Sequence, residues 1–329
     1  MAEGYRYLVP PPIVARGAAG DRLDVRMSQL IREAAPGQAF DVGFIGVPLS
    51  RASISPSAAS ENPTAIRLAW RLFASYNLDY DVDLAALRIA DLGDVTMHVT
   101  DIPRCHANIE EAVVEALSSH PPFFPVFIGG DHSITCPIVK GLKRVTPGRT
   151  IGILQVDTHF DLRNLHDGGP SNGTPMRGLI ESGTVAGSNI VTIGVHGHFN
   201  ALAYKRYADE QGVRYYTVRE VRRRGVEAVV DEALAYLRAR VDAIYLTVDM
   251  DVLDVAFAPA APASTPGGLA TWDLLEAAHR IGREEKLAAM DLVCLDPHRD
   301  GRAQSTVKTG AHVVLNVLCG YAQRIRQQG

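Results

Sequence analysis

The segment from Ile151 to Asp161 constrains the fold of this 329-residue chain more than any other stretch. It starts as an unbroken apolar run with β-branched residues, which is typical of a strand buried on both faces, and it ends in Asp157, His159 and Asp161. If the chain stays extended, side chains spaced by two point to one side. The three groups would then converge on a divalent cation. For this segment alone, a turn in which the acids cap a helix is an equally good interpretation.

Two other segments repeat the pattern of an apolar strand that runs into metal-binding residue types. Residues 127–133 pass through two glycines to His132, and residues 243–254 end in Asp249 and Asp251. Ligands of parallel α/β sheets bind at the carboxyl ends of the strands, so these segments can meet in space. A mostly carboxylate set suits Mn²⁺ or a similar oxygen-preferring ion better than zinc. So many acids would repel one another unless two metals shared them.

Strands and helices alternate along the rest of the chain. The predicted strands are 41–48, 87–95, 123–129, 150–156, 190–195, 213–217, 243–248 and 288–295, and the predicted helices are 65–73, 102–117, 137–142, 200–212, 226–238, 271–281 and 306–326. This alternation predicts an α/β fold, a single domain in which a parallel sheet is covered by helices on both faces. Residues 1–40, with three consecutive prolines, are predicted to be an N-terminal extension on the surface or on a neighbouring subunit, and residues 41–329 form the domain.

Composition limits the partners of the chain. A net charge of −4 gives no sign of a nucleic-acid partner or of an anionic membrane surface. The four cysteines have no Cys-x-x-Cys spacing, which favours a reducing compartment. The N-terminus lacks a basic segment followed by an apolar stretch, and no apolar run approaches the length of a membrane span. We therefore expect a soluble, cytoplasmic protein.

Three motifs together resemble the ureohydrolase family of arginase, agmatinase and formimidoylglutamase. They are Gly-Gly-Asp-His at 129–132, Asp-x-His-x-Asp at 157–161, and Asp-Met-Asp-Val-Leu-Asp at 249–254 before the proline-rich segment 258–268. The resemblance extends over about residues 41–323. It implies an arginase-like three-layer α/β/α fold, a small-molecule substrate and two Mn²⁺ per subunit.

The resemblance also implies which residues hold the two ions. One manganese is expected on His132, Asp157, Asp161 and Asp249, and the other on Asp157, His159, Asp249 and Asp251. A hydroxide between the ions would be the nucleophile, and Asp161 would accept a hydrogen bond from it and help to aim it. The ligands would also accept nickel, cobalt or iron, so the native metal stays open. Members of the family are commonly trimers or hexamers, and we expect a homo-oligomer here.

Two positions separate this chain from the members that hydrolyse guanidines. Those members share a histidine before Gly-Thr, which passes a proton to the leaving amine, and a glutamate in the last strand, which pairs with the guanidinium. This chain has Asn172 and Cys294 at those places. An amide cannot carry a proton as imidazole does, and a thiol does not pair with a delocalised cation. Both differences favour a formimino substrate.

Segments 50–60, 167–183 and 193–200 are similar to bacterial formimidoylglutamases of histidine breakdown. That similarity implies the hydrolysis of N-formimidoyl-L-glutamate to L-glutamate and formamide. A hydroxide would attack the formimino carbon, the metals would stabilise the developing charge, and a proton would pass to the glutamate nitrogen.

Such a substrate carries two carboxylates, which need cationic or donor groups near the pocket mouth. The candidates for substrate binding are Arg177, Asn172, Arg163, His196 and Asn200. Arg177 is the first candidate because an arginine fork matches a carboxylate, whereas a solvated or structural role competes for Arg163 and His196. His166 lies near the position of the missing histidine and is a candidate for proton transfer, although Asn172 occupies the aligned place.

Two alternatives stay open at this stage. An amidinohydrolase such as agmatinase or guanidinobutyrase would release urea, and it would need Asp296 or another acid in place of the missing glutamate. A metal-binding member without turnover would serve as a regulatory or assembly subunit. Six ionisable ligands held at strand ends favour an enzyme over that second alternative.

Overall fold

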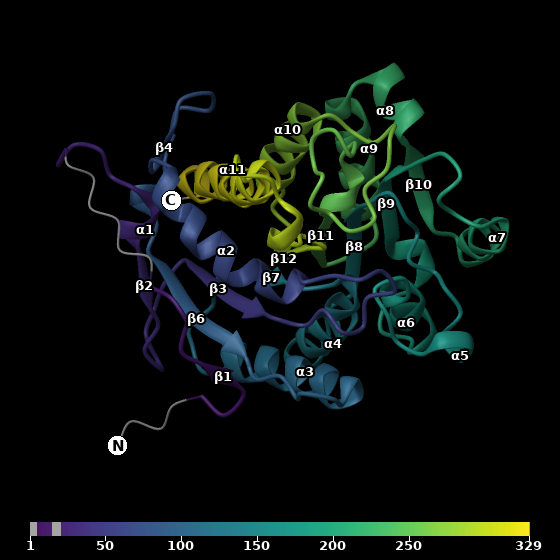
Figure 1. Ribbon diagram of the computed structural model, residues 1–329, viewed down its shortest axis with the longest axis horizontal. Helices are drawn as coiled ribbons and strands as arrows, with labels where there is room; N and C mark the ends of the chain where they lie inside the picture. Colours follow the sequence, from purple (N-terminus) through teal and green to yellow (C-terminus); the bar gives the residue numbers. More distant parts are fainter. Residues whose placement is uncertain (1–4, 15–20, 329) are drawn as a thin grey trace.

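One large sheet forms the centre of the protein (Figure 1). A computed structural model describes residues 5–14 and 21–328. The sheet has ten strands in the order β1-β6-β3-β7-β12-β11-β8-β9-β10, with β2 also paired to β6. The strands are β1 (Leu8–Val9), β2 (Ile31–Glu33), β3 (Val42–Val47), β6 (Ile89–Val95), β7 (Phe124–Gly129), β8 (Ile151–Val156), β9 (Ile190–Val195), β10 (Arg214–Thr217), β11 (Ala243–Asp249) and β12 (Leu287–Val293). In the described part of the chain, β1 is antiparallel to β6 and the other pairings of this sheet are parallel.

Helices cover both faces of the sheet, so the predicted three-layer α/β/α fold is confirmed (Figure 1). The helices that pack into one apolar core are α2 (Asn62–Ala69), α8 (Val218–Arg224), α9 (Val226–Arg238), α10 (Thr271–Gly282) and α11 (Ser305–Gln328). Those that pack into the core on the other face are α3 (Ile102–Ser118), α4 (Thr135–Val145), α6 (Pro175–Glu181) and α7 (Leu202–Gln211). Buried strand residues alternate between the two cores, as in β8, where Leu154 faces one and Ile153 the other.

The long elements have nearly the bounds that periodicity predicts, and β9 and α9 match them residue for residue. Several short elements were not predicted. They are the strands β1 and β2, the helices α1 (Met27–Leu30), α5 (Leu165–Gly168), α6 and α8, and a separate hairpin of β4 (Tyr76–Asn77) with β5 (Val82–Asp83). A helix of four to seven residues or a strand of two or three residues contains too few periods to be separated from a loop. Within the described residues, no helix is both long and apolar enough to cross a membrane.

Part of the N-terminal region joins the main sheet. Strands β1 and β2 both pair with β6 at one edge, and Tyr5 OH lies 2.5 Å from His120 Nε2. Residues 1–4 and 15–20 of the predicted extension lie outside the described residues. The division of the chain at residue 40 stays a prediction.

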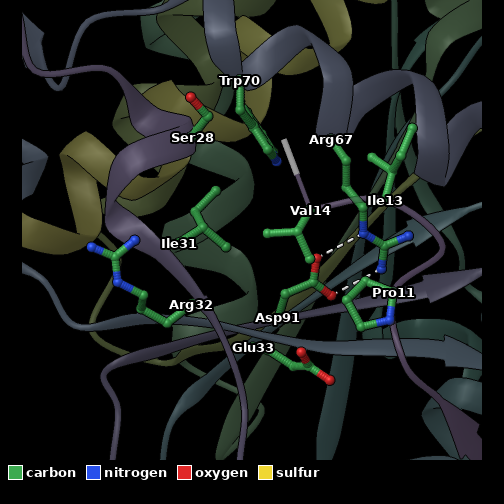
Figure 2. Close-up of a pocket in the computed structure, with 10 residues that line it drawn as sticks. All are labelled: Pro11, Ile13, Val14, Ser28, Ile31, Arg32, Glu33, Arg67, Trp70 and Asp91. Carbon is green, nitrogen blue, oxygen red and sulfur yellow. Dashed lines mark hydrogen bonds and ion pairs between the residues drawn. The ribbon is translucent and has the colours of Figure 1, made fainter. Parts of the chain in front are cut away.

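A buried ion pair lies beneath this N-terminal region, beside a small cavity. Figure 2 shows the Arg67 guanidinium of α2 facing Asp91 of β6, and Trp70 and Val14 also line the cavity. Arg67 Nε lies 2.7 Å from Asp91 Oδ2, and Nη1 lies 2.6 Å from Asp94 Oδ1. Burial disfavours the charged guanidinium, but the two acids outweigh burial and raise the pKa of Arg67. The pairing makes burial of these charges tolerable and ties α2 to the edge of the sheet.

The contact between α3 and the turn before α4 leads to a prediction about how stability depends on pH. His106 of α3 lies with Nε2 3.0 Å from Ser133 Oγ, and burial, helped by Lys140, lowers the pKa of His106 to about 4. Glu110, Lys140 and Glu181 line the same cavity as His106. In the unfolded chain, His106 therefore takes up a proton below pH ~6.5. In the folded chain, it takes up this proton only near pH 4, so the two states differ by one bound proton between these pH values.

Neutral His106 thus contributes stability that is intact above pH ~6.5 and is lost as the pH falls to about 4, by about 3 kcal/mol in all. His106→Gln keeps a hydrogen-bonding group but cannot titrate. Urea unfolding between pH 4 and 7 should show a shallower pH dependence for the variant than for the unchanged protein. Parallel curves for the two proteins would contradict this assignment.

Candidate metal centre

The predicted metal ligands come together at the carboxyl edge of the sheet. Val156 of β8 pairs with Val248 of β11, so Asp157, directly after β8, lies beside Asp249, the last residue of β11. His132 comes from the turn after β7, which lies across β12 from β11. Strands that are distant in sequence therefore supply ligands to one place, as their carboxyl ends predict.

One group of ligands surrounds His132. Its Nδ1 atom lies 2.7 Å from Asp161 Oδ2 and 3.2 Å from both Asp157 Oδ2 and Asp249 Oδ2. All four side chains are buried. This is the set that the family resemblance implies for the first metal.

A second group lies on the other side of Asp157. His159 Nδ1 lies 3.1 Å from Asp251 Oδ2 and 3.5 Å from Asp157 Oδ1. Asp157 thus turns one oxygen towards His132 and the other towards His159, as a carboxylate that bridges two cations would. His159 is only partly buried, so this group lies nearer to solvent.

These donors fit two divalent cations. His132 with Asp157 and Asp249, and Asp157 with His159 and Asp251, each offer ligand atoms within 4.8 Å of one another. The Nδ1 atom of His132 and the Oδ2 atom of Asp161 are buried without a hydrogen-bond partner. A buried polar atom left unpaired is costly, and a cation would satisfy both atoms. Imidazole nitrogens with carboxylate oxygens match the preferences of Mn²⁺ and related ions.

Without bound cations, the buried carboxylates of the site repel one another. Burial, and then the charges of Asp251 and Asp157, raise the pKa of Asp249 to about 8. Burial and Asp157 likewise raise the pKa of Asp161 to about 6. Burial opposes a positive charge on His132, but Asp161 and the other facing carboxylates outweigh it and raise the pKa of His132. Positive charge is therefore what this set of side chains lacks.

Buried polar side chains hold the ligands in place from behind. Gln155 Nε2 donates to Asp157 Oδ2 at 2.7 Å, and Thr192 Oγ1 donates to Gln155 Oε1 at 2.8 Å. Thr247 Oγ1 lies 2.8 Å from His132 Nε2, which leaves Nδ1 free to face the carboxylates. Such contacts fix the orientation of metal-binding side chains.

A buried acid, Asp291, contacts the residues that support the metal ligands. Asp291 pairs in register with Thr247 on the neighbouring strand, and its Oδ2 accepts hydrogen bonds from Thr135 Oγ1 at 2.6 Å and Tyr245 OH at 2.7 Å. These supporting residues were missed in the sequence analysis. The signal was available, because Gln155, Thr247 and Asp291 are polar residues inside apolar strand runs.

The segment after β8 reaches this geometry by a turn, which corrects the expectation of an extended alternation. The strand ends at Val156, and Asp161 has a φ of 52°, in the left-handed region that residues other than glycine rarely adopt. The backbone oxygen of Asp161 accepts a hydrogen bond from Arg177 N at 3.2 Å. The turn, rather than the two-residue period, brings Asp161 back to His132.

A cavity of about 140 Å³ opens beside the metal ligands. Its wall is formed by loop residues and by the ends of strands and helices: Ile54, Ser55, His159, Asp161, Leu162, Arg163, Asn172, Gly173, Phe199, Asn200, Tyr204, Asp249, Asp251 and Ala263. Four of the predicted ligands thus border a space in which a small molecule can reach them.

The predicted substrate-binding residues divide into two groups. Arg163, Asn172 and Asn200 line the cavity. Arg163 is the one arginine or lysine among the described residues of the wall. Asn200 also holds the ligand loop, because its Oδ1 accepts from Phe160 N and its Nδ2 donates to Thr158 O, both at 2.9 Å.

Three other candidates lie outside the wall. Arg177 is engaged on α6, where Nε lies 2.5 Å from Glu181 Oε1 and the guanidinium stacks 3.7 Å from the ring centre of Tyr207. His196 lies with its two ring nitrogens 3.1 Å from Gly194 O and Thr265 Oγ1. His166 is an exposed residue of α5.

Several wall residues were missed in the sequence analysis. Phe199 and Tyr204 give the cavity an aromatic side, and Gly173 allows the Arg163 side chain to lie flat against the backbone. A Cβ atom at Gly173 would lie 2.5 Å from Arg163 Cδ. Ile54 and Ser55 belong to the polar loop after β3, where binding residues are common in α/β folds. No periodic pattern marks Phe199 or Tyr204.

Comparisons with known proteins show which proteins this chain resembles. The sequence model of the Arginase family matches residues 40–320. A formimidoylglutamase from Halalkalibacterium halodurans is 46% identical over 278 residues, which cover 84% of this chain and 86% of that protein. The crystal structure of formimidoylglutamase from Bacillus subtilis aligns with a TM-score of 0.89 at 38% identity, over 94% of this chain and 95% of that one. A Trypanosoma cruzi formiminoglutamase solved with Mn²⁺ shares the fold, with a TM-score of 0.83 at 24% identity over 92% and 99% of the two chains.

Proposed function

The chain belongs to the arginase family, and on that premise we propose that it is a formimidoylglutamase, which hydrolyses N-formimidoyl-L-glutamate to L-glutamate and formamide. Like its relatives, it is a hydrolase that acts on a carbon–nitrogen bond of a linear amidine. The family implies a binuclear metal site, and the two ligand groups around Asp157 fit one.

The observation that carries the choice of substrate is Asn172. It occupies the place of the histidine that the guanidine-hydrolysing members use for proton transfer, and its Oδ1 already accepts a hydrogen bond from Ile54 N at 2.9 Å. The other departure, Cys294, is buried, and burial together with Asp249 and Asp251 raises its thiol pKa well above the usual range. Asn172 cannot pass a proton to the leaving amine, and Cys294 cannot pair with a guanidinium. Both differences favour formimidoylglutamate over agmatine or guanidinobutyrate as the substrate.

We assign the metals to the six side chains already described. Two divalent cations bound there would lower the pKa of a water and stabilise the negative charge that develops as the amidine carbon is attacked. Asp157, with Gln155 behind it, holds one oxygen towards each ligand group. Asp161, whose Oδ2 belongs to the ligand group around His132, would accept a hydrogen bond from the attacking water and help to aim it. Collapse of the adduct breaks the bond to the glutamate nitrogen, which takes up a proton that came from that water.

Arg163 is our candidate for a substrate carboxylate. Arg163→Leu should lower kcat/KM about 30- to 150-fold, since a hydrogen-bonded charge pair contributes roughly 2–3 kcal/mol. Gly173→Ala should act in the same direction but less strongly, because its Cβ displaces the Arg163 side chain. Steady-state kinetics of both variants provide the measurement. A larger loss for Arg177→Leu than for Arg163→Leu would return the role to Arg177.

The proposed function is tested by offering the manganese-loaded protein four substrates separately and measuring two products. N-Formimidoyl-L-glutamate should yield formamide, whereas agmatine, 4-guanidinobutyrate and arginine should yield no urea. Urea from any of those three would replace the proposal with an amidinohydrolase. No product from all four, in protein that holds two metals, would favour the alternative of a non-catalytic family member.

Three further assignments belong to the proposal. Manganese is supported by the donor set and by the ion in the Trypanosoma cruzi fold neighbour. A homo-oligomer, trimer or hexamer, is supported by the family resemblance, and light scattering after size exclusion tests it. A cytoplasmic location is supported by the free state of all four cysteines, which suits a reducing compartment.

A further inference from the structure

We propose that Asn172 and Asp296 are positioning residues that hold the loop 50–58 as a fixed wall of the substrate cavity, so that the loop sets which substrates enter. The inference deepens the proposed function and rests on it for the identity of the substrate. The loop follows β3 and contributes Ile54 and Ser55 to the cavity. Nothing in the mechanism above uses Asp296.

Asn172 holds the first half of the loop by two hydrogen bonds. Its backbone N donates to Ala52 O at 3.0 Å, and its Oδ1 accepts from Ile54 N at 2.9 Å. Together they align the segment after β8 with the loop much as a short strand pairing would. Asp131 adds a third contact, since its Oδ2 accepts from Ala52 N at 3.1 Å.

Asp296 holds the second half of the loop. Its Oδ2 accepts from Ala58 N at 2.9 Å, while its Oδ1 accepts from His298 N at 3.0 Å. Arg299, which pairs with Asp296 at 3.3 Å, also donates to Pro56 O. Asp296 is 3% exposed and lies outside the described residues that line the cavity, so it acts on the substrate only through the loop.

Packing alone does not fix the part of the loop that faces the cavity. Ile54 is 54% exposed, and Pro56 is exposed as well. Little apolar area is buried there, so hydrogen bonds to the side chains of Asn172, Asp131 and Asp296, which come from three other segments, carry the positioning. Asn172 occupies the position where guanidine chemistry needs a histidine, and Asp296 is the acid that would have to replace the missing glutamate. The chain uses both to hold the loop instead.

The test measures loop mobility and kinetics separately in the full-length, manganese-loaded protein. Hydrogen–deuterium exchange is followed in peptides that cover residues 50–60 for Asn172→Leu, Asp296→Ala and Asp296→Asn. The matched control is Asp83→Ala, which removes a comparable backbone contact to Ala85 N in the β4–β5 region. KM and kcat are measured with formimidoylglutamate for the Asp296 variants.

We expect exchange of the loop amides to quicken at least tenfold in Asn172→Leu and Asp296→Ala, and to stay near the original rate in Asp83→Ala. Asp296→Ala should raise KM about five- to tenfold with kcat within twofold, and Asp296→Asn, which keeps an oxygen for Ala58 N, should restore both readouts.

Unchanged loop exchange in Asn172→Leu and Asp296→Ala would overturn the inference, as would a loss confined to kcat. Exchange does not depend on the substrate. If the unaltered protein released no formamide, the proposed function would fail while exchange still decided whether the two residues hold the loop.

Discussion

Replacing Asp251 by alanine is expected to lower turnover about a thousandfold, which corresponds to roughly 4 kcal/mol of transition-state stabilisation. Asp251 faces His159 at 3.1 Å and is 2% exposed, and it belongs to one of the two ligand groups alone. Its loss should therefore remove one cation and leave the group around His132. The chain should stay folded, because removing one of several mutually repelling buried acids relieves repulsion in the metal-free site.

Kinetics, metal content and far-ultraviolet circular dichroism of the purified variant provide the measurement. The matched control is Asp254→Ala, which changes an acid of the same motif whose oxygens accept from Ala256 N at 2.9 Å and Gly267 N at 2.6 Å. That variant should keep both metals and lose less than about tenfold in turnover, since it removes only hydrogen bonds of a turn. Near-normal turnover in Asp251→Ala would rule out the assignment of the second ligand group.

Removing both cations with a chelator should abolish turnover and lower thermal stability. A ligand held at 1,000 times its dissociation constant stabilises the folded state by about 4 kcal/mol per site. For a chain of 329 residues that gain corresponds to an increase in Tm of roughly 6 °C for each site. Manganese should restore both properties with a stoichiometry of two per chain, because six ligands are divided into two groups that share Asp157.

Activity and Tm are followed together while Mn²⁺ is returned to the chelated protein. Magnesium serves as the control ion, since it demands near-octahedral oxygen ligation and suits two imidazoles poorly. Full activity of protein that contains less than a tenth of an equivalent of any metal would contradict the mechanism. Restoration at one equivalent would contradict the binuclear assignment alone.

One property of the sequence predicted both the long elements and the convergence of the metal ligands. Buried parallel strands such as β8 and β11 are nearly all apolar, so a polar residue directly after them marks the edge of the sheet. His132, Asp157 and Asp249 were found in this way. Their distances then follow from strand order, which the sequence analysis did not predict.

The parts that were not predicted depend on contacts between segments that are distant in sequence. Arg177 was the first candidate for a substrate carboxylate, but Glu181 and Tyr207 engage its guanidinium. Arg163 reaches the cavity along a path beside Gly173, where a Cβ atom would lie 2.5 Å from Arg163 Cδ. The left-handed backbone at Asp161 has no local signal, since residues other than glycine adopt it under tertiary constraint.

The place of β12 in the sheet has a consequence for how the protein is made. Strand β12 lies between β7 and β11, although it is synthesised after both. A nascent chain that ends just after residue 251 therefore contains all six ligands, but His132 and Asp249 cannot take up their spacing until β12 has been inserted between their strands. The group around His132 then forms only after β12 has been synthesised, and a polypeptide truncated before that strand lacks a formed binuclear centre.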